Sequence, residues 1–441
     1  MKPIQVGLLG IGTVGSGVFN VLQRNQDEIS RRAGRGIAVT MVADLDVERA
    51  KTIVGPGVQV VNDARAVIAN PDIDIVIELI GGYGIAKQLV MEAIAAGKHV
   101  VTANKALLAV HGTEIFAAAQ AKGVMVAFEA AVAGGIPIIK ALREGLTANR
   151  IQWLAGIING TTNFILSEMR DKGLDFDAAL QDAQRLGYAE ADPTFDIEGV
   201  DAAHKVTIMS AIAFGIPVQF DKAYVEGITQ LAAQDIKYAE QLGYRIKLLG
   251  ITKRTPNGIE LRVHPCLIPA KRLIANVEGA MNAVMVQGDA VGTTLYYGKG
   301  AGSEPTASAV IADLVDITRL HTADAAQRVP HLAFQPNAMS DMPVLPMSDV
   351  VTSYYLRLRV ADETGVLAKV TGILADAGIS IDAVLQREAD EISGAAQVAQ
   401  TDVIILTHDC VEAKMNAAMA QMQALPTVLE PITRIRKEEL A

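Results

Sequence analysis

A short apolar strand at the N-terminus runs directly into a glycine-rich turn, and this arrangement constrains the fold more than any other feature of the chain. Residues 4–9 form the strand, an apolar-periodic helix follows, and the turn between them is Gly10-Ile11-Gly12-Thr13-Val14-Gly15. In a dinucleotide-binding unit, such glycines allow the tight turn, the close approach of a pyrophosphate to the backbone and helix-strand packing. Helix amides then hold the anion. We therefore expect the cofactor contacts to be Gly10, Gly12, Thr13, Val14 and Gly15.

Strands and helices alternate through the first third of the chain. Half of the residues are hydrophobic but only 4% are aromatic, which is typical of parallel sheets covered by helices. Further strands are predicted at 38–43, 73–80, 99–102 and 124–128, and helices at 86–96 and 114–121. The pattern predicts an α/β Rossmann-type domain with a doubly wound sheet.

The pattern changes after about Gly134 and again after residue 320. Strands are predicted at 151–158, 260–267, 282–288 and 291–297 with helices between them, and a proline-containing stretch of little periodicity precedes a compact α+β tail. The expected division is a nucleotide-binding domain at 1–133 with helix 303–320 packed against it, a mixed α/β domain at 134–320, a linker at 321–352 and an α+β domain at 353–441.

Charge and cysteine content exclude several classes of function. A formal net charge of −10 disfavours nucleic acid and anionic membranes as partners, because both require a basic face. Cys266 and Cys410 are far apart and lack metal-ligand spacing, so we expect neither a disulfide framework nor a zinc site. The N-terminus lacks the features of a secretory signal, and no apolar run approaches about 20 residues. We expect a cytoplasmic protein that binds small solutes.

Asp44 ends the second predicted strand, where a carboxylate can bind the ribose of NAD and repel the 2′-phosphate of NADP. It lies farther from Gly15 than the roughly 20 residues usual for this motif, because a basic stretch with Arg31, Arg32 and Arg35 lengthens the connection. Those arginines could reach a phosphate, and the carboxylate could be an ordinary solvated strand end. We predict NAD or NADP as the cofactor, with NAD slightly favoured.

Asp201 and Lys205 stand four residues apart on a helix predicted at 200–214, so their side chains share one face. A surface ion pair would explain them, but the rest of this helix is apolar. A lysine in a partly dry pocket can move a proton, because desolvation lowers its pKa toward neutrality. Transfer of a hydride to a carbonyl needs such a proton source. His204 points about 100° away from Lys205, and we expect it to be a packing or surface residue.

Four long strings match one enzyme family: TANKALLA at 102–109, EAAVAGGIPII at 129–139, GIINGTTNFIL at 156–166 and GYAEADPTFDIEGVDAAHKVTI at 187–208. Together they resemble homoserine dehydrogenase. The resemblance implies reversible NAD(P)-linked interconversion of L-homoserine and L-aspartate 4-semialdehyde, in the biosynthesis of threonine, methionine and isoleucine. It also implies that the domain at 134–320 binds homoserine and forms the contacts of a homodimer or homotetramer.

The resemblance implies roles for individual residues. Lys205 is similar to the family's proton-transferring lysine, and Asp201 to the acid that positions substrate or water. Glu190 resembles the ligand of the homoserine amino group, and Lys105 a lysine near the nicotinamide and the substrate. Lys105 could instead be a strand-end surface charge, and the Asn-Gly pair an ordinary turn. Further matches to cleft-lining and cofactor-lining positions are Asn159, Gly160, Thr161 and Gly302.

In similar enzymes a monovalent cation, typically sodium, binds beside the EAAVAGGIP loop. The matching ligands are the carboxylate of Glu129 and the backbone carbonyls of Val132, Gly134 and Ile136, and oxygen ligands suit a hard cation. The glycines could serve only the turn, so we expect a structural site. Relatives that prefer NADP often carry an arginine directly after the second strand, whereas this chain has Asp44-Leu45-Asp46 there. This departure favours NAD or dual use.

The tail at 356–381 is similar to an ACT domain, with Asp362, Gly365 and Gly378 at the strand-helix turn and the helix exit. The resemblance implies that a pathway amino acid, with threonine as the expected effector, binds where two such domains pair. The tail could instead serve only to dimerise the protein.

Two other functions stay open on sequence grounds. A different semialdehyde reductase would need a cysteine or a lysine in different sequence surroundings. The Asn-Gly-Thr-Thr-Asn string also disfavours this function. An amino-acid sensor that binds a nucleotide without catalysis would leave Glu190, Asp201 and Lys205 unexplained. Reduction of NAD or NADP by L-homoserine distinguishes the three functions.

Overall fold

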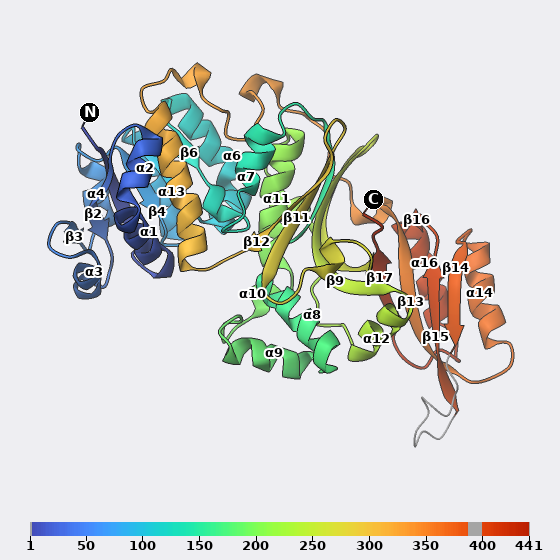
Figure 1. Ribbon diagram of the computed structural model, residues 1–441. Helices are drawn as coiled ribbons and strands as arrows, with labels where there is room; N and C mark the ends of the chain where they lie inside the picture. The colour runs from blue at the N-terminus through green and yellow to red at the C-terminus, as the bar shows by residue number, and fades with distance from the viewer. Residues whose placement is uncertain (1, 387–398, 441) are drawn as a thin grey trace.

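The computed structural model describes residues 2–386 and 399–440, and the N-terminal third of the chain forms a lobe at one end of an elongated molecule (Figure 1). Its strands are β1 (Ile4–Leu9), β2 (Ile37–Ala43), β3 (Gln59–Val61), β4 (Ile75–Glu78), β5 (His99–Thr102) and β6 (Val126–Ala127). They form one parallel sheet in the order β3-β2-β1-β4-β5-β6. The order reverses between β1 and β4, and a dinucleotide binds at such a reversal, outside the carboxyl ends of the strands.

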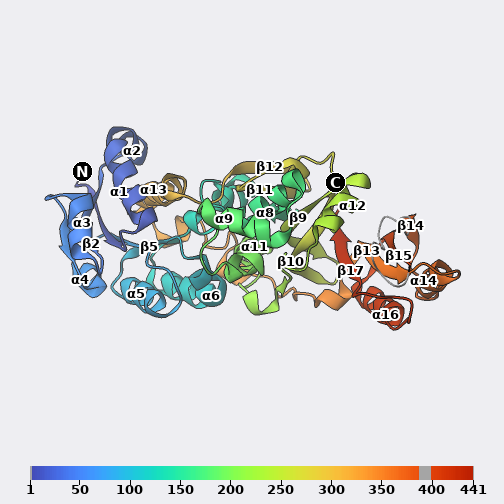
Figure 2. The same cartoon turned by 90° about the horizontal axis from the view of Figure 1, so that it is seen from below.

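Helices cover both faces of this sheet, so its strands are buried on both sides (Figure 2). The helices are α1 (Thr13–Arg24), α2 (Gln26–Ala33) and α13 (Ser303–Leu320) on one face, α4 (Ala64–Ala69), α5 (Gly84–Ala95) and α6 (Lys105–Lys122) on the other, and α3 (Val47–Val54) beside β3. α13 comes from far along the chain and packs closely on α1. The approach is close enough that a Cβ added at Gly17 would lie 2.7 Å from the Ser303 carbonyl oxygen. The predicted doubly wound fold is confirmed.

A second sheet of eleven strands runs from the middle of the chain into its C-terminal part. Its strands are β7 (Ile151–Ile157), β8 (Tyr224–Val225), β9 (Tyr244–Thr255), β10 (Gly258–Pro269), β11 (Met281–Gly288), β12 (Gly292–Lys299), β13 (Val351–Ala361), β14 (Ile381–Gln386), β15 (Gln400–Thr407), β16 (Cys410–Val411) and β17 (Thr433–Lys437). The order is β12-β11-β7-β9-β10-β17-β13-β15-β14, with β8 on β10 and β16 on β13. Periodicity did not predict β9, β14 or β17. Basic residues interrupt the apolar alternation of β9 and β17.

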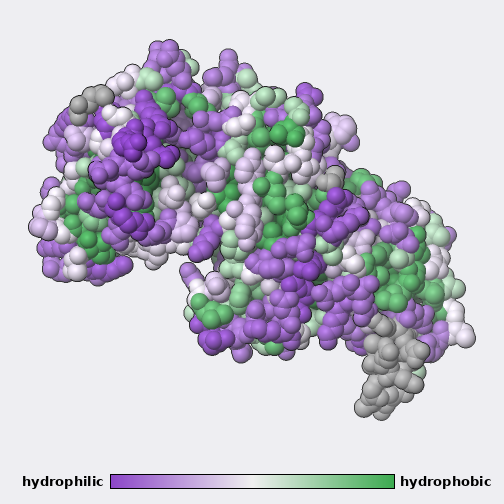
Figure 3. Space-filling view, in the orientation of Figure 1, coloured by the Kyte–Doolittle hydropathy of each residue, from purple (hydrophilic) through white to green (hydrophobic). Residues whose placement is uncertain are grey.

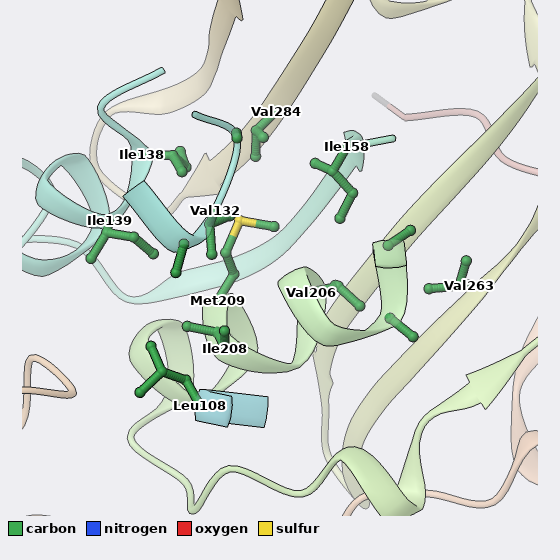
Figure 4. Packing of buried hydrophobic residues seen from close by; sticks show 14 of the residues in the cluster. Leu108, Val132, Ile138, Ile139, Ile158, Val206, Ile208, Met209, Val263 and Val284 are labelled. Carbon is green, nitrogen blue, oxygen red and sulfur yellow. The ribbon is translucent and has the colours of Figure 1, made fainter. Parts of the chain in front are cut away.

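One helix of the central part is buried on all sides. The helices here are α7 (Ile138–Lys140), α8 (Gly160–Lys172), α9 (Phe176–Arg185), α10 (Thr194–Ile197), α11 (Val200–Phe214) and α12 (Ala233–Gln241). Every residue of α11 after Val200 is buried, and most of them are apolar, as expected for a helix that lies inside a core. Figure 4 shows Val206, Ile208 and Met209 of α11 enclosed by side chains from α6, β10 and β11 and from the segments around β7 and α7. The core therefore fixes the position of α11.

The C-terminal domain is joined to the central part by backbone pairing. It adds α14 (Val366–Asp376) and α16 (Glu412–Gln423) to strands β13–β17. β17 pairs in parallel with β10, through Cys266 with Arg436, and antiparallel with β13. A buried ion pair between Arg357 and Asp235 of α12 crosses the same junction. Within the described residues, no helix combines the length and the apolar character needed to cross a membrane.

Candidate active site

The glycine turn lies at the carboxyl end of β1. Gly10 has φ +89°, a backbone conformation that glycine adopts without strain. A Cβ at Gly15 would lie 2.3 Å from the Gly10 carbonyl oxygen, whereas a Cβ at Gly12 would meet nothing within 4 Å. Gly15 is therefore required for packing, and Gly12 faces free space. Thr13 and Val14 begin α1, where the first amides have no partner inside the helix and can hold an anion.

Asp44 lies half-buried beside this turn. Its Oδ2 accepts a hydrogen bond from the amide of Ile11 (2.8 Å), and its Oδ1 accepts one from the amide of Asp46 (2.9 Å). The carboxylate thus ties the end of β2 to the glycine turn and gives this end of the crevice a negative charge. Arg31 and Arg32 form ion pairs with Glu28 on α2.

Gly302 precedes α13 with φ +123° and serves as its N-cap residue. The neighbouring Ser303 Oγ donates a hydrogen bond to the carbonyl oxygen of Thr13 (2.7 Å). The N-terminus of α13 therefore meets the N-terminus of α1, and Gly302 lies next to the glycine turn. The space-filling view shows the surface indented between this lobe and the part that carries α8 and α9 (Figure 3).

Lys205, Asp201 and Lys105 form one charged cluster between the nucleotide-binding lobe and the central domain. The Lys205 Nζ donates hydrogen bonds to Asp201 Oδ2 and to the carbonyl oxygen of Ile158, both at 2.7 Å. The Lys105 Nζ, from the start of α6, lies 3.3 Å from Asp201 Oδ1. The exposed fractions are 11% for Lys205, 5% for Asp201 and 31% for Lys105. Lys105 is the member that reaches toward solvent.

Burial and ion pairing set the protonation of this cluster. Burial alone would raise the pKa of the Asp201 carboxyl, but Lys205 and Lys105 hold it at about 2. Burial lowers the pKa of the Lys205 ammonium from its ordinary value, and Asp201 opposes that change. The cluster thus joins a permanently charged carboxylate to a lysine that burial has made easier to deprotonate.

Asn159 connects this cluster to a second carboxylate, which sequence analysis missed. Its side-chain amide donates to Asp201 Oδ2 (2.8 Å) and to Asp196 Oδ1 (2.6 Å), while its Oδ1 caps α8 at Thr162. Burial, followed by the charge of Asp201, raises the pKa of Asp196. Asp196 lies inside the string at 187–208, and the helical turn that begins at Thr194 directs it toward α11. That helical turn was the feature that could have indicated the role of Asp196.

Other predicted substrate contacts surround the start of α8. A Cβ at Gly160 would lie 2.8 Å from the Ala280 carbonyl oxygen, so the close approach there requires glycine. Thr161 Oγ1 donates to the carbonyl oxygen of Tyr188 (2.7 Å). Glu190 lies exposed in the same loop, and its carboxylate makes no hydrogen bond or ion pair with the residues that the structure describes. The structure therefore joins Asn159 to the charged cluster, whereas the Glu190 side chain has no partner among the described residues.

The loop expected to bind a cation is buried. The Glu129 carboxylate accepts hydrogen bonds from the amides of Ile139 (3.0 Å) and Lys140 (2.8 Å). Burial raises its pKa to about 7, although these amides oppose the change. Val132 and Ile136 are buried and Gly134 has φ +43°. A carboxylate and backbone carbonyls are oxygen donors that suit a hard cation, and in this structure both oxygens of Glu129 accept backbone amides.

His204 is a packing residue, as predicted. Its ring packs edge-on against Phe220 at 4.3 Å between centroids and also contacts Phe195. Burial lowers its pKa to about 4. Cys266 and Cys410 are both buried and free, and burial raises the pKa of each thiol, so neither is an activated nucleophile.

Three family models match the chain: "Homoserine dehydrogenase, NAD binding domain" at residues 10–129, "Homoserine dehydrogenase" at 137–315 and "ACT domain" at 354–426. The homoserine dehydrogenase of Pseudomonas aeruginosa is 60% identical over 441 residues and that of Neisseria gonorrhoeae 57% over 440, each with 100% of both chains covered. The crystal structure of a homoserine dehydrogenase from Thiobacillus denitrificans superposes with a TM-score of 0.95 at 66% identity and covers 100% of this chain and 99% of that one.

Proposed function

This chain belongs to the homoserine dehydrogenase family, and we propose that Lys205 transfers the proton of its reaction. It is an NAD(P)-dependent oxidoreductase that interconverts L-homoserine and L-aspartate 4-semialdehyde. The glycine turn would hold a nicotinamide dinucleotide, which would supply the hydride acceptor for oxidation of the hydroxyl-bearing carbon of homoserine and the hydride donor for the reverse reaction. The hydroxyl proton must then be taken up by the protein.

The hydrogen bonds of the Lys205 Nζ carry this proposal. An ammonium has three donors, and two of them are directed to Ile158 and Asp201. The third remains for the substrate oxygen. In oxidation the neutral amine takes the hydroxyl proton, and in reduction the ammonium returns it to the carbonyl oxygen. Burial lowers the pKa of Lys205, so the neutral amine that oxidation requires is easier to reach than in an exposed lysine.

The charges around the cleft match the zwitterionic end of homoserine. We propose that Glu190 binds the ammonium group, since its carboxylate is exposed and unpaired within the described residues. The amides at the start of α8, near Gly160 and Thr161, suit the carboxylate because a helix N-terminus attracts anions. Asn159 and Asp196 would then hold Asp201 and the substrate hydroxyl in one network.

We propose further roles for residues outside this cluster. The glycine turn, Asp44 and Gly302 would bind the dinucleotide, and the negative charge of Asp44 favours NAD over NADP. Glu129 with the carbonyls of Val132, Gly134 and Ile136 would hold sodium or another monovalent cation in a structural role. We propose that the enzyme acts in the cytoplasm as a homodimer or homotetramer and that threonine binding to the ACT domain inhibits it.

Replacement of Lys205 tests the proposed role. Lys205→Ala should lower kcat for NAD(P)-linked oxidation of L-homoserine by about 10²–10⁴-fold, the usual contribution of a positioned acid-base group, while the Kd for the cofactor stays near the wild-type value. The exposed Lys222→Ala is the matched control and should leave kcat unchanged. An unaltered kcat in Lys205→Ala would refute the assignment.

A further inference from the structure

A cavity of about 330 Å³ lies between the nucleotide-binding lobe and the central domain, apart from the residues of the candidate active site. Its walls come from β6, from α13, from the segment around Val329 and from a π-helix at Ala141–Gly145 that continues α7. Figure 1 shows β6, α7 and α13 close to one another. π-Helices are rare and frequently occur at functional sites.

Arg143 of this π-helix lacks a strong anionic partner. Its side chain is 12% exposed, and its only ion pair within the described part of the chain is with Glu144 at 3.5 Å. Its Nε is buried, and no described residue accepts a hydrogen bond from it. A desolvated guanidinium is costly unless an anion pairs with it, and its fork of donors matches a carboxylate. The cavity therefore presents an unsatisfied cation to a ligand.

Asp313 of α13 also lines the cavity and is 4% exposed. One of its oxygens accepts a hydrogen bond from the Glu129 amide (2.9 Å), and it makes no ion pair with any described residue. Ile317, Leu320 and Val329 form an apolar wall. The lining also includes Lys140 and Arg319, which both pair with Asp316. The charge of Arg143 opposes the rise in the pKa of Asp313 that burial causes, yet no ion pair within 4 Å joins the two residues. The cavity thus combines a cation, an acidic group that forms no ion pair with the described residues, and an apolar wall.

We propose that this cavity binds a small aliphatic L-α-amino acid, with its carboxylate on Arg143, its ammonium on Asp313 and its side chain on the apolar wall. A simple anion would satisfy Arg143 and leave Asp313 unused, so a zwitterion fits the lining better. The volume lies within the range of small-molecule sites, about 300–1,000 Å³. The proposal depends neither on Lys205 nor on the ACT domain.

Binding to the full chain tests this proposal. Calorimetric titration of the wild-type protein with L-valine, L-isoleucine, L-threonine and L-methionine should reveal a site that binds at least one of these amino acids. Isovalerate and isobutylamine, each of which lacks one of the two charges, should bind to the same site at least tenfold more weakly. Arg143→Gln should weaken this site at least tenfold, and Asp313→Asn should do so for the amino acid but not for isovalerate. Arg49→Gln, an exposed arginine far from the cavity, is the control.

A third variant keeps the test decisive if the buried substitutions unfold the protein. Val329 is 36% exposed, so Val329→Trp should fill the cavity without removing a charge, and the same site should disappear. Equal stoichiometry and affinity in the wild type, Arg143→Gln and Val329→Trp would overturn the proposal. Binding of sulfate without binding of any amino acid would also overturn it.

Discussion

Replacing Asp201 with asparagine should change the proton affinity of Lys205 while leaving the shape of the site intact. Asp201 raises the pKa of Lys205 against the effect of burial. Homoserine oxidation needs the neutral amine, so the rate rises with pH through the pKa of Lys205. Loss of the carboxylate should move this acid limb of the kcat/KM profile to lower pH. The plateau should also fall, because the lysine becomes a weaker base.

The pKa of Asp201 gives the size of the effect. Despite burial, the pKa lies at about 2 instead of 3.8, which corresponds to a net stabilisation of the carboxylate of about 2 kcal/mol at ~1.4 kcal/mol per unit. Lys205, at 2.7 Å, contributes more to this than Lys105 at 3.3 Å. We therefore expect the acid limb to shift by about one to two pH units.

The assay is the pH dependence of kcat/KM for L-homoserine at saturating cofactor. Asp196→Asn should shift the limb in the same direction by less, because Asp196 contributes least among the groups that raise the pKa of Lys205. The exposed Asp221→Asn should not shift it. A limb that stays in place in Asp201→Asn, or moves to higher pH, would refute the coupling between the two residues.

Three further predictions concern the cofactor, acid stability and regulation. Asp44→Ser should raise kcat/KM with NADP relative to NAD by about tenfold, equivalent to ~1.4 kcal/mol of removed repulsion; an unchanged ratio would separate Asp44 from cofactor choice. Because burial lowers the pKa of His204 to about 4, the neutral ring stabilises the fold above pH 6.5, and that stability is lost as the pH falls from 6.5 toward 4. His204→Phe should therefore lose up to about 3 kcal/mol less between pH 7 and pH 4 in urea unfolding, and equal losses would contradict this. Asp362→Ala should raise the threonine concentration for half-inhibition at least tenfold with kcat unchanged; a purely dimerising tail would give no threonine response in either protein.

Local sequence patterns predicted the parts of the fold that depend on local chemistry. The glycine turn and the helix at 200–214 follow from steric requirements and from an apolar surface, and both occur where expected. β9 and β17 were missed because Lys247 and Arg436, which are buried in them, find partners from distant segments. Likewise, the parallel pairing of β17 with β10 joins residues about 170 positions apart, and no local pattern encodes such a contact.

Only part of the candidate site could be predicted from the sequence. The spacing of Asp201 and Lys205 placed them on one helical face, and the structure joins them at 2.7 Å. The contact of Lys105 with Asp201 depends on how α6 packs on α11. Asp196 was missed because its role depends on Asn159, which lies 37 residues earlier. Periodicity identifies the face of a helix, and tertiary packing decides what meets it.

The most direct test of Lys205 as the proton carrier is a crystal structure with L-homoserine and an inert cofactor analogue bound. We predict that the Lys205 Nζ lies about 3 Å from the substrate hydroxyl oxygen and that the Glu190 carboxylate contacts the substrate ammonium. A substrate whose hydroxyl contacts another side chain, with Lys205 bound only to Asp201 and Ile158, would contradict the proposed mechanism.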